Sequence, residues 1–332
     1  MRMKKKPIDL IKEKIFESQS IAITSHLRPD GDSLCTGLAF YFMAKQLKKD
    51  VQIINKDIVP FPFNNIPDIE NIKIGQIPPQ GFDLVLLLEC ANVKRSGQNN
   101  LGGYFKINID HHYSNDYYAD INWVEPEAAA VGCMAYELGQ KLLIKFTPQI
   151  ATHLYCAIVS DTGSFQFSNT RARSLEVCSE LIKYGANPVS VSDFLFNNNP
   201  PEKIKLLGQV LSTLRMNSEG NIAIITMFKS FLDSLPFPEI DTEDITTMAR
   251  SIKNVEMVLF LKEMEDGVFR ISIRSKGSSN AAYIAESFGG GGHIHASGFK
   301  VKGDYNKLIQ EIPVKVTQLL KQYKEKERDK AI

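Results

Sequence analysis

Short apolar runs alternate with segments of helical periodicity through the first half of the chain. Strand-like runs occupy residues 21–25, 51–55, 83–89 and 104–110, and helical patterns occupy residues 34–47, 128–143 and 148–159. The run DLVLLLE at 83–89 is almost continuously apolar, which is typical of a central parallel strand covered on both faces. This alternation predicts an α/β domain with a mostly parallel sheet flanked by helices, in which ligands bind beyond the carboxyl ends of the strands.

The pattern changes after the segment FLFNNNPP at 194–201, where three Asn and two Pro favour a loop. Beyond it, strand-like runs occupy residues 221–227, 255–261 and 269–273, and helical patterns occupy residues 242–251, 281–288 and 307–324. We therefore predict a first domain over residues 1–193, a linker over 194–214 and a second, smaller α/β domain over 215–332.

The composition is that of an ordinary globular protein. The chain has 332 residues, 43% of them hydrophobic, and 39 basic against 38 acidic residues leave a formal net charge of +1. These values exclude a disordered or coiled-coil chain. The charge balance argues against long duplex DNA as a partner, since each phosphate contact needs Lys or Arg. No apolar stretch approaches the roughly 20 residues of a membrane span, so no membrane partner is expected.

The five cysteines are widely spaced and form no CxxC motif. This spacing predicts neither a disulfide framework nor a zinc knuckle, and it favours the reducing cytoplasm. The sequence does not decide the oligomeric state, and a homodimer stays open.

Histidine and carboxylate residues gather where the predicted strands and helices end. They fall in four clusters, which are His26 with Asp30 and Asp32, then Glu89, then Asp110-His111-His112, and then Asp161. Carboxylates at one sheet edge repel one another, and divalent cations neutralise that repulsion. Mixed imidazole and carboxylate ligands suit manganese or iron better than calcium. Two such ions can activate water and hold a phosphoryl oxygen. In the alternative reading each Asp caps a helix or turn, as Asp32 could, but this reading explains one residue better than four clusters.

The motifs around these residues resemble a known family. HLRPDGDS at 26–33 resembles the first motif of the DHH phosphoesterase superfamily, Asp110-His111-His112 resembles its name-giving motif, and SDTGSFQFSNT at 160–170 resembles its fourth. RISIRSKG at 270–277 and FGGGGHIHASGF at 288–299 resemble the DHH-associated C-terminal domain. The arrangement is most similar to the short-chain oligoribonucleases. The resemblance implies a metal-dependent phosphodiesterase that acts on short single-stranded oligonucleotides, with phosphatase activity on nucleoside bisphosphates such as 3′-phosphoadenosine 5′-phosphate.

The resemblance also implies a role for each residue of the clusters. It implies two divalent metal ions, which we expect to be Mn²⁺. His26 and Asp30 would bind one ion, and Asp32 and His111 would bind the other. Asp161 and Glu89 would contact both ions. His112 would lie over the substrate phosphate as a hydrogen-bond donor or proton source, and Asp110 would orient an imidazole.

Glu89 departs from the family pattern, which has Asp at this strand end. Asp83 is a poor substitute because it lies six residues upstream, roughly 20 Å away along a strand at ~3.3 Å per residue. Glu89 is therefore the candidate ligand. Metal spacing, metal choice and activity depend on how its extra methylene is accommodated, whereas the fold does not.

A glycine run near the C-terminus is a candidate anion site. Glycine lets backbone amides approach a phosphate closely, although such a run alone is more often a turn or hinge. Charged side chains nearby could add hydrogen bonds to a phosphate or nucleotide. The predicted substrate-binding residues are Arg274, Ser275, Gly290, Gly291, Gly292 and His293.

Other readings remain open at this point. The first is a cyclic- or linear-dinucleotide phosphodiesterase on the same scaffold, and the second is a degenerate nucleotide-binding protein in which Glu89 has weakened catalysis. A manganese pyrophosphatase fits less well, because GGGGH is not its lysine- and arginine-rich motif. His153, within an apolar helix, is expected to be a core histidine. Arg171 and Arg173 could face the active site or solvent.

Overall fold

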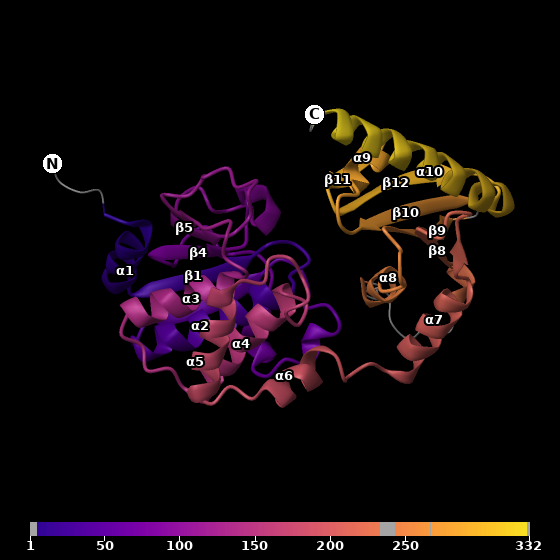
Figure 1. Cartoon of the computed structure of the whole chain (residues 1–332). Helices are drawn as coiled ribbons and strands as arrows, with labels where there is room; N and C mark the ends of the chain where they lie inside the picture. Colours follow the sequence, from indigo (N-terminus) through magenta and orange to yellow (C-terminus); the bar gives the residue numbers. More distant parts are fainter. Residues whose placement is uncertain (1–4, 233–242, 266, 331–332) are drawn as a thin grey trace. The chain divides into compact units, whose positions relative to one another are not determined.

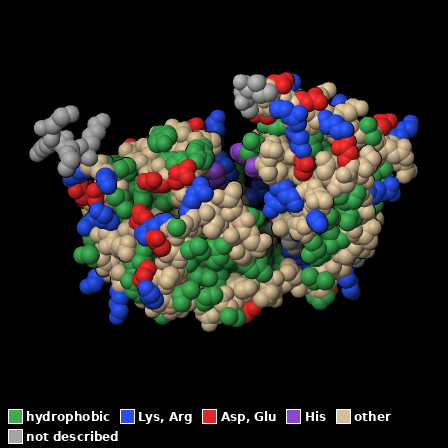
Figure 2. All heavy atoms as spheres, viewed as in Figure 1, with side chains coloured by type: hydrophobic (Ala, Val, Ile, Leu, Met, Phe, Trp, Pro, Cys, Tyr) green, Lys and Arg blue, Asp and Glu red, His purple; other side chains and the backbone are tan. Residues whose placement is uncertain are grey.

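The computed structural model describes residues 5–232, 243–265 and 267–330, and the chain divides into two compact units between Asn198 and Asn199. Each unit has its own six-stranded sheet with helices packed against it (Figure 1). The α/β class predicted for both parts of the chain is confirmed. Figure 2 shows basic and acidic side chains interspersed on one face of the first unit, as expected for a chain of formal net charge +1.

The sheet of the first unit is entirely parallel, with strand order β3-β2-β1-β4-β5-β6. Its strands are β1 (Ser20–Ser25), β2 (Asp50–Asn55), β3 (Ile72–Ile74), β4 (Leu84–Leu88), β5 (Phe105–Asp110) and β6 (Ile121–Val124). Its helices are α1 (Pro7–Glu17), α2 (Gly31–Gln46), α3 (Val131–Lys141), α4 (Pro148–Asp161), α5 (Ala172–Lys183) and α6 (Pro188–Leu195). Short 3₁₀ helices follow the strands at η1 (Phe63–Asn65), η2 (Ile69–Asn71) and η3 (Val93–Ser96).

Strand β4 lies near the centre of this sheet and is buried along its whole length, as its apolar run predicts. Leu86 and Leu88 pack in the large core with α2, α3 and α4, whereas Val85 and Leu87 pack in a smaller core on the opposite face with Leu101. One face of the sheet is therefore covered by helices. The other is covered by the connections on either side of β4, which contribute Ile77 and Leu101.

The strand order changes direction between β1 and β4. From β1 the chain adds β2 and β3 on one side, and from β4 it adds β5 and β6 on the other. In parallel sheets the connections diverge at such a point and leave room for a ligand beyond the carboxyl ends of the strands. His26 follows β1 directly, and Glu89 follows β4 directly.

The sheet of the second unit has the order β11-β12-β10-β9-β8-β7 and is antiparallel except for the pair β8 and β9. Its strands are β7 (Arg215–Met216), β8 (Ile222–Met227), β9 (Met257–Glu265), β10 (Val268–Ser275), β11 (Gly291–His293) and β12 (Ala296–Lys302). Its helices are α7 (Pro201–Ser212), η4 (Lys229–Phe231), α8 (Glu243–Arg250), α9 (Ala281–Glu286) and α10 (Tyr305–Lys330). Alternate residues of β8 enter two cores, one with α9 and α10 and the other with α7 and α8.

The structure differs from the predicted linker over residues 194–214. Helix α7 occupies most of that segment, and its Leu206 and Val210 are buried in the core of the second unit. The two prolines predicted a loop, but Pro201 is the first residue of the helix. At that position the N–H that proline lacks would have no partner within the helix, so no hydrogen bond is lost. Of the helix predicted over 242–251, residue 242 lies outside the described residues. Among the described helices, none is long and apolar enough to span a bilayer.

Candidate metal centre

The structure brings together all six residues predicted as metal ligands. They form two trios in which one ligand atom of each residue lies within 4.8 Å of the others. The trios consist of His26, Asp30 and Glu89, and of Asp32, His111 and Asp161. They lie at the carboxyl ends of β1, β4 and β5, beside the start of α2 and the end of α4. Each of Glu89 and Asp161 falls in one trio by this distance, and the trios also influence one another, because burial, then Asp30, and then the charge of Asp32 in the second trio raise the pKa of Glu89 in the first. That Glu89 and Asp161 contact both ions stays a prediction.

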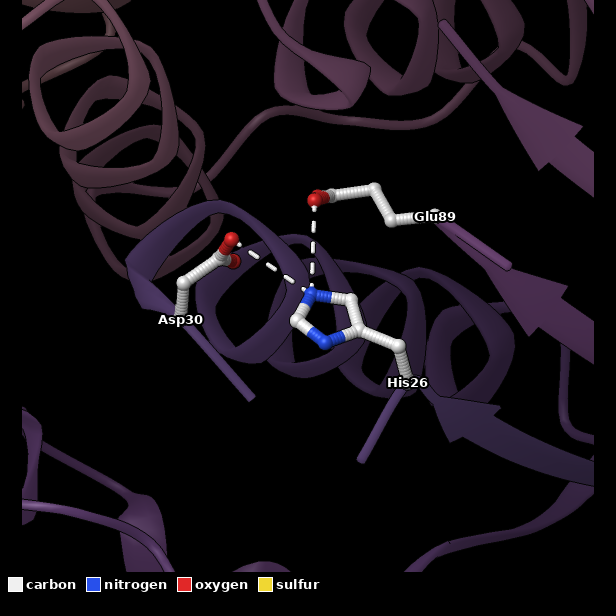
Figure 3. Close-up of side chains that lie close together, drawn as sticks. All are labelled: His26, Asp30 and Glu89. Carbon is white, nitrogen blue, oxygen red and sulfur yellow. Dashed lines mark ion pairs between the residues drawn. The ribbon is translucent and has the colours of Figure 1, made fainter. Parts of the chain in front are cut away.

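In the first trio, the side chains of Asp30 and Glu89 point toward the imidazole of His26 (Figure 3). His26 Nε2 lies 3.4 Å from Asp30 Oδ2 and 3.8 Å from Glu89 Oε2. His26 Nδ1 is 2.9 Å from the Leu27 carbonyl oxygen, to which it donates. This hydrogen bond assigns the proton to Nδ1, so the Nε2 lone pair can bind a cation between the two carboxylates.

Asp30 and Asp32 have different structural roles at the start of α2. Asp30 is the N-cap of α2 and accepts a hydrogen bond from Ser33 N (3.0 Å), so the alternative reading in which Asp32 caps this helix is wrong. Asp32 is buried and accepts hydrogen bonds from Val131 N (2.6 Å) and Gly132 N (3.0 Å). These amides open α3, whose own N-cap is an alanine without a capping side chain. Asp32 thus caps a helix distant in sequence and is fixed in position by it.

Glu89 has a buried carboxylate with an unsatisfied atom. Its side chain is 1% exposed, and Oε1 has no hydrogen-bond partner. Burial, and then the charges of Asp30 and Asp32, raise the pKa of Glu89 well above its usual range. An orphaned buried oxygen is costly, and a bound cation would satisfy it. Asp83, at the other end of β4, accepts hydrogen bonds from Gln19 N (2.7 Å) and Ser20 N (2.9 Å).

The second trio repeats this arrangement around His111. His111 Nδ1 is 3.0 Å from the Ala128 carbonyl oxygen, and Nε2 is 3.8 Å from Asp161 Oδ2. Burial, and then the charge of Asp32, raise the pKa of Asp161 to about 7. Asn169 donates to Asp161 Oδ2 (3.2 Å) and to the Ala129 carbonyl oxygen (3.0 Å). Asn169 is not among the residues predicted from the sequence, although it lies within the motif SDTGSFQFSNT.

The carboxylates of the two trios disfavour one another's ionisation. Burial is the largest cause that raises the pKa of Asp32, as it is for Glu89 and Asp161. For Asp30 burial also opposes ionisation, but the adjacent His26 imidazole and the hydrogen bonds from Ser33 together outweigh it and hold the pKa at about 2. Imidazole nitrogens with several carboxylate oxygens are a donor set for divalent transition metals. The residues present therefore fit divalent cations.

His112 and Asp110 form a separate pair beside the second trio. His112 Nδ1 lies 2.7 Å from Oδ1 of the fully buried Asp110, and the rings of His112 and His111 meet edge to face at 5.0 Å. Asp110 also accepts a hydrogen bond from Asn115 Nδ2 (2.6 Å). Although burial opposes it, the hydrogen bond from His112 lowers the pKa of Asp110. The geometry thus places an oriented imidazole beside the second trio. Asn115 was missed because nothing in the sequence marks it as a partner of Asp110.

In the second unit, the predicted substrate residues lie on β10, β11 and the turn before β11. Arg274 is near the end of β10 and is partly exposed. Ser275 is 2% exposed, and its hydroxyl lies 2.7 Å from the Ser279 carbonyl oxygen, to which it donates. This burial differs from the prediction that Ser275 contacts a substrate, because the hydroxyl is already engaged within the unit.

The glycines of the run GGGG have different surroundings. A Cβ on Gly290 would lie 2.6 Å from Phe299 Cβ, and one on Gly292, where φ is +144°, would lie 2.6 Å from the Ala296 carbonyl oxygen. These two positions need glycine for close packing on β12. Gly291 has no described atom within 4 Å of such a Cβ, and His293 is exposed. Gly291, like Gly289 of the same run, therefore has open space in which a ligand can approach the backbone.

Three further expectations concern residues outside the trios. His153 is buried and its Nε2 lies 2.9 Å from Asp68 Oδ2, which confirms a core histidine with a hydrogen-bond partner. Arg171 and Arg173 are half-exposed and form ion pairs with Glu127 (3.1 Å) and Glu137 (3.3 Å).

The fold and the site define a class, a two-domain α/β protein with a candidate metal centre at the carboxyl edge of a parallel sheet. Residues 20–158 match the DHH family N-terminal domain, and residues 205–325 match the DHHA1 domain. The bifunctional oligoribonuclease and PAP phosphatase NrnA of Thermus thermophilus is 32% identical over 304 residues, which are 90% of each chain. The protein of the same name from Bacillus subtilis is 32% identical over 225 residues, which are 66% of this chain and 70% of the other.

Solved structures share the fold. An exopolyphosphatase-related protein from Bacteroides fragilis superposes with a TM-score of 0.84 at 25% identity over 96% of both chains. RecJ of Thermus thermophilus in complex with Mn²⁺ has a TM-score of 0.54 at 12% identity, over 95% of this chain and 54% of that one. The chain belongs to the DHH family of phosphoesterases, which are hydrolases, and the family resemblance of its motifs is confirmed.

Proposed function

We propose that this protein hydrolyses short single-stranded oligonucleotides to mononucleotides with divalent cations, and also removes phosphate from 3′-phosphoadenosine 5′-phosphate. The observation that carries the proposal is the pair of trios beside the Asp110–His112 hydrogen bond. The similarity to oligoribonuclease and PAP phosphatase relatives supports the choice of substrates.

The first trio would hold one cation and the second trio another, with Mn²⁺ as the expected metal. When bound, such ions activate water and neutralise charge on the phosphoryl group. Asp32 contributes to this site in a second way, because the first amides of α3 hold its carboxylate in place. His26 and His111 present Nε2, since a backbone carbonyl oxygen fixes Nδ1 of each ring.

His112 would act on the phosphate. Asp110 binds Nδ1, which leaves Nε2 to donate a hydrogen bond to a phosphate oxygen or a proton to the leaving 3′-oxygen. In the second unit, Arg274, His293 and the backbone around Gly291 would hold the nucleotide, and Ser275 would position the segment that follows β10. All five cysteines are free and buried, which supports a reducing cytoplasm.

The test is a panel of substrates with the purified full-length protein. RNA and DNA of two to seven nucleotides, 3′-phosphoadenosine 5′-phosphate and a cyclic dinucleotide are each incubated with Mn²⁺ or with chelator. We expect mononucleotide release from short RNA and phosphate release from the bisphosphate, only with the metal. Exclusive cleavage of the cyclic dinucleotide would support the other phosphodiesterase reading. Binding of nucleotides without turnover would support the degenerate binding protein.

A further inference from the structure

Three loops beyond the carboxyl ends of β1, β2 and β4 pack against one another beside the first trio. Leu27 N donates to the Arg95 carbonyl oxygen at 2.6 Å, which joins the loop after His26 to η3. Arg28 N donates to Asp57 Oδ2 at 2.8 Å, which joins the same loop to the one after β2. A Cβ on Gly97 would lie 2.9 Å from Lys56 Cγ, so the outer two loops also meet.

These loops carry four exposed basic side chains, Arg28, Lys56, Lys94 and Arg95, which we name the loop cation cluster. None of the four forms an ion pair with a carboxylate in the part of the chain that the structure describes. Elsewhere in this unit the exposed guanidinium groups of Arg171 and Arg173 are neutralised by glutamates. The four cations outnumber the Asp57 carboxylate that lies between these loops, so the loop cation cluster has excess positive charge beside the first trio, in a chain that is nearly neutral as a whole.

Two apolar side chains stand among these cations. Ile58 is 72% exposed and follows Asp57, and Leu27 is 39% exposed and precedes Arg28. The hydrogen bond between Arg28 and Asp57 keeps the two apolar residues on joined loops. An inorganic polyphosphate would use the cations alone, whereas a nucleotide chain offers both phosphates and base faces. The combination favours a nucleotide chain.

We propose that the loop cation cluster binds the phosphodiester backbone of an oligonucleotide beyond the scissile bond, with Leu27 and Ile58 in contact with the bases. This inference rests on the proposed function and adds to it a preference for length. An oligonucleotide with further nucleotides beyond the scissile bond reaches the cluster, whereas a nucleoside bisphosphate has no further backbone to bind there.

The direct test compares two double variants that lose the same charge. Lys56→Gln/Lys94→Gln alters the cluster. The control, Lys45→Gln/Lys48→Gln, alters two exposed lysines that precede the amino end of β2, whereas the cluster lies beyond the carboxyl ends of the strands. Binding of a fluorescein-labelled single-stranded RNA pentanucleotide is measured by anisotropy in chelator, where it is not hydrolysed. We expect the cluster variant to raise Kd about tenfold. The slope of log Kd against log salt concentration should fall by about 1.4, because each of the two lost phosphate contacts contributes roughly 0.7. Equal Kd values for the two double variants would overturn the proposal.

A second arm separates a nucleotide chain from any polyanion. Ile58→Ser should weaken binding of the pentanucleotide several-fold and leave inhibition by tripolyphosphate unchanged. If tripolyphosphate displaces the pentanucleotide as effectively as unlabelled pentanucleotide does, or if Ile58→Ser has no effect, the cluster is a general anion surface and the proposal is wrong.

Turnover separates this inference from the proposed function. In the cluster variant the ratio of kcat/KM for the pentanucleotide to kcat/KM for the bisphosphate should fall about tenfold, and in the control variant it should not. A cluster variant with the wild-type ratio overturns the inference while the proposed function stands. If no substrate is hydrolysed but the anisotropy results hold, the proposed function fails and the binding site stands.

Discussion

At the scale of single residues, Glu89 combines a backbone in the left-handed region with a buried carboxylate that has an unsatisfied oxygen. It directly follows β4 and has a φ of +56°, a conformation that costs a non-glycine residue about 1–2 kcal/mol. Two groups hold the turn, because Glu89 N donates to the Ile109 carbonyl oxygen (3.0 Å) and Asn108 Nδ2 donates to the Cys90 carbonyl oxygen (3.2 Å). The strained turn delivers a buried, partly unsatisfied carboxylate to His26.

The first prediction is that Glu89 is a working metal ligand. Glu89→Gln should lose one metal per chain and most turnover, because a neutral amide cannot offset the charge of the cation in the first trio. Glu89→Asp should keep both metals and keep or raise activity, since the family pattern has Asp here. Metal content by mass spectrometry and nuclease rate check both. Unchanged metal content and rate in Glu89→Gln would show that the carboxylate is not used.

The second prediction concerns the Asp110–His112 pair. Asp110→Asn replaces the acceptor that fixes the His112 tautomer, so kcat should fall by about 10²–10⁴-fold, the range of general acid–base catalysis, while metal content stays at the wild-type level. Asp83→Asn, an equal change at the amino end of β4, is the control and should leave kcat within about twofold. Equal effects of the two substitutions would remove the catalytic assignment of His112.

At the scale of elements, the site depends on how closely α2, α3 and α4 approach. A Cβ on Gly132 of α3 would lie 2.7 Å from Ala157 Cβ of α4, and the Gly132 amide is one of the two that hold Asp32. Helical periodicity in the sequence predicts α3 over 128–143, but the helix begins only at Val131. Its start is fixed by the hydrogen bond to Asp32, which lies 99 residues before Val131. Helical periodicity depends on neighbouring residues and cannot predict a partner that is distant in the sequence.

The third prediction is that Gly132→Ala disturbs the second trio. The added methyl group should push α3 away from α4, at a cost of about 1–3 kcal/mol in the free energy of unfolding, and should weaken metal binding. Gly208→Ala in α7 is the matched control, because a Cβ there meets no described atom within 4 Å. It should raise stability by about 0.5–1 kcal/mol. Chemical denaturation and metal titration check both, and a Gly132→Ala protein with wild-type stability would contradict this packing account.

At the scale of the whole molecule, the sequence predicts two α/β domains and the residues of the metal centre, because both rest on local patterns. The apolar run of β4 and the residues that end each strand are visible in the chain itself. What the sequence does not predict depends on distant partners. Examples are the assignment of α7 to the second unit through Leu206, the division of six ligands into two trios, and the internal hydrogen bond of Ser275.

The fourth prediction concerns the stability of the metal-free protein. Burial raises the pKa of Asp161 to about 7, so between about pH 4 and pH 7 the folded protein binds a proton that the unfolded chain has lost. The free energy of unfolding must therefore fall as pH rises through this window. Burial also raises the pKa values of Glu89 and Asp32, which act with the same sign. In chelator we expect a Tm a few degrees lower at pH 8 than at pH 5, and Mn²⁺ should raise Tm more at pH 8.

The control for this prediction is Asp161→Asn, which has no carboxyl group to titrate. It should reduce the difference in Tm between the two pH values. The comparison is needed because burial lowers the pKa of His153, which acts with the opposite sign. Identical pH dependence in the wild type and Asp161→Asn would contradict the assignment of the effect to the metal centre.

The central claim, that the two trios bind the cations needed for hydrolysis of short RNA, is tested most directly by titrating metal-free protein with Mn²⁺. Bound metal per chain and release of mononucleotide from a labelled dinucleotide are followed in the same samples, for the wild type and for Asp161→Ala. We expect activity to appear as occupancy approaches two ions per chain, and folded Asp161→Ala to bind fewer ions and to be inactive. Full activity in the metal-free protein, or wild-type turnover in Asp161→Ala, would contradict the claim.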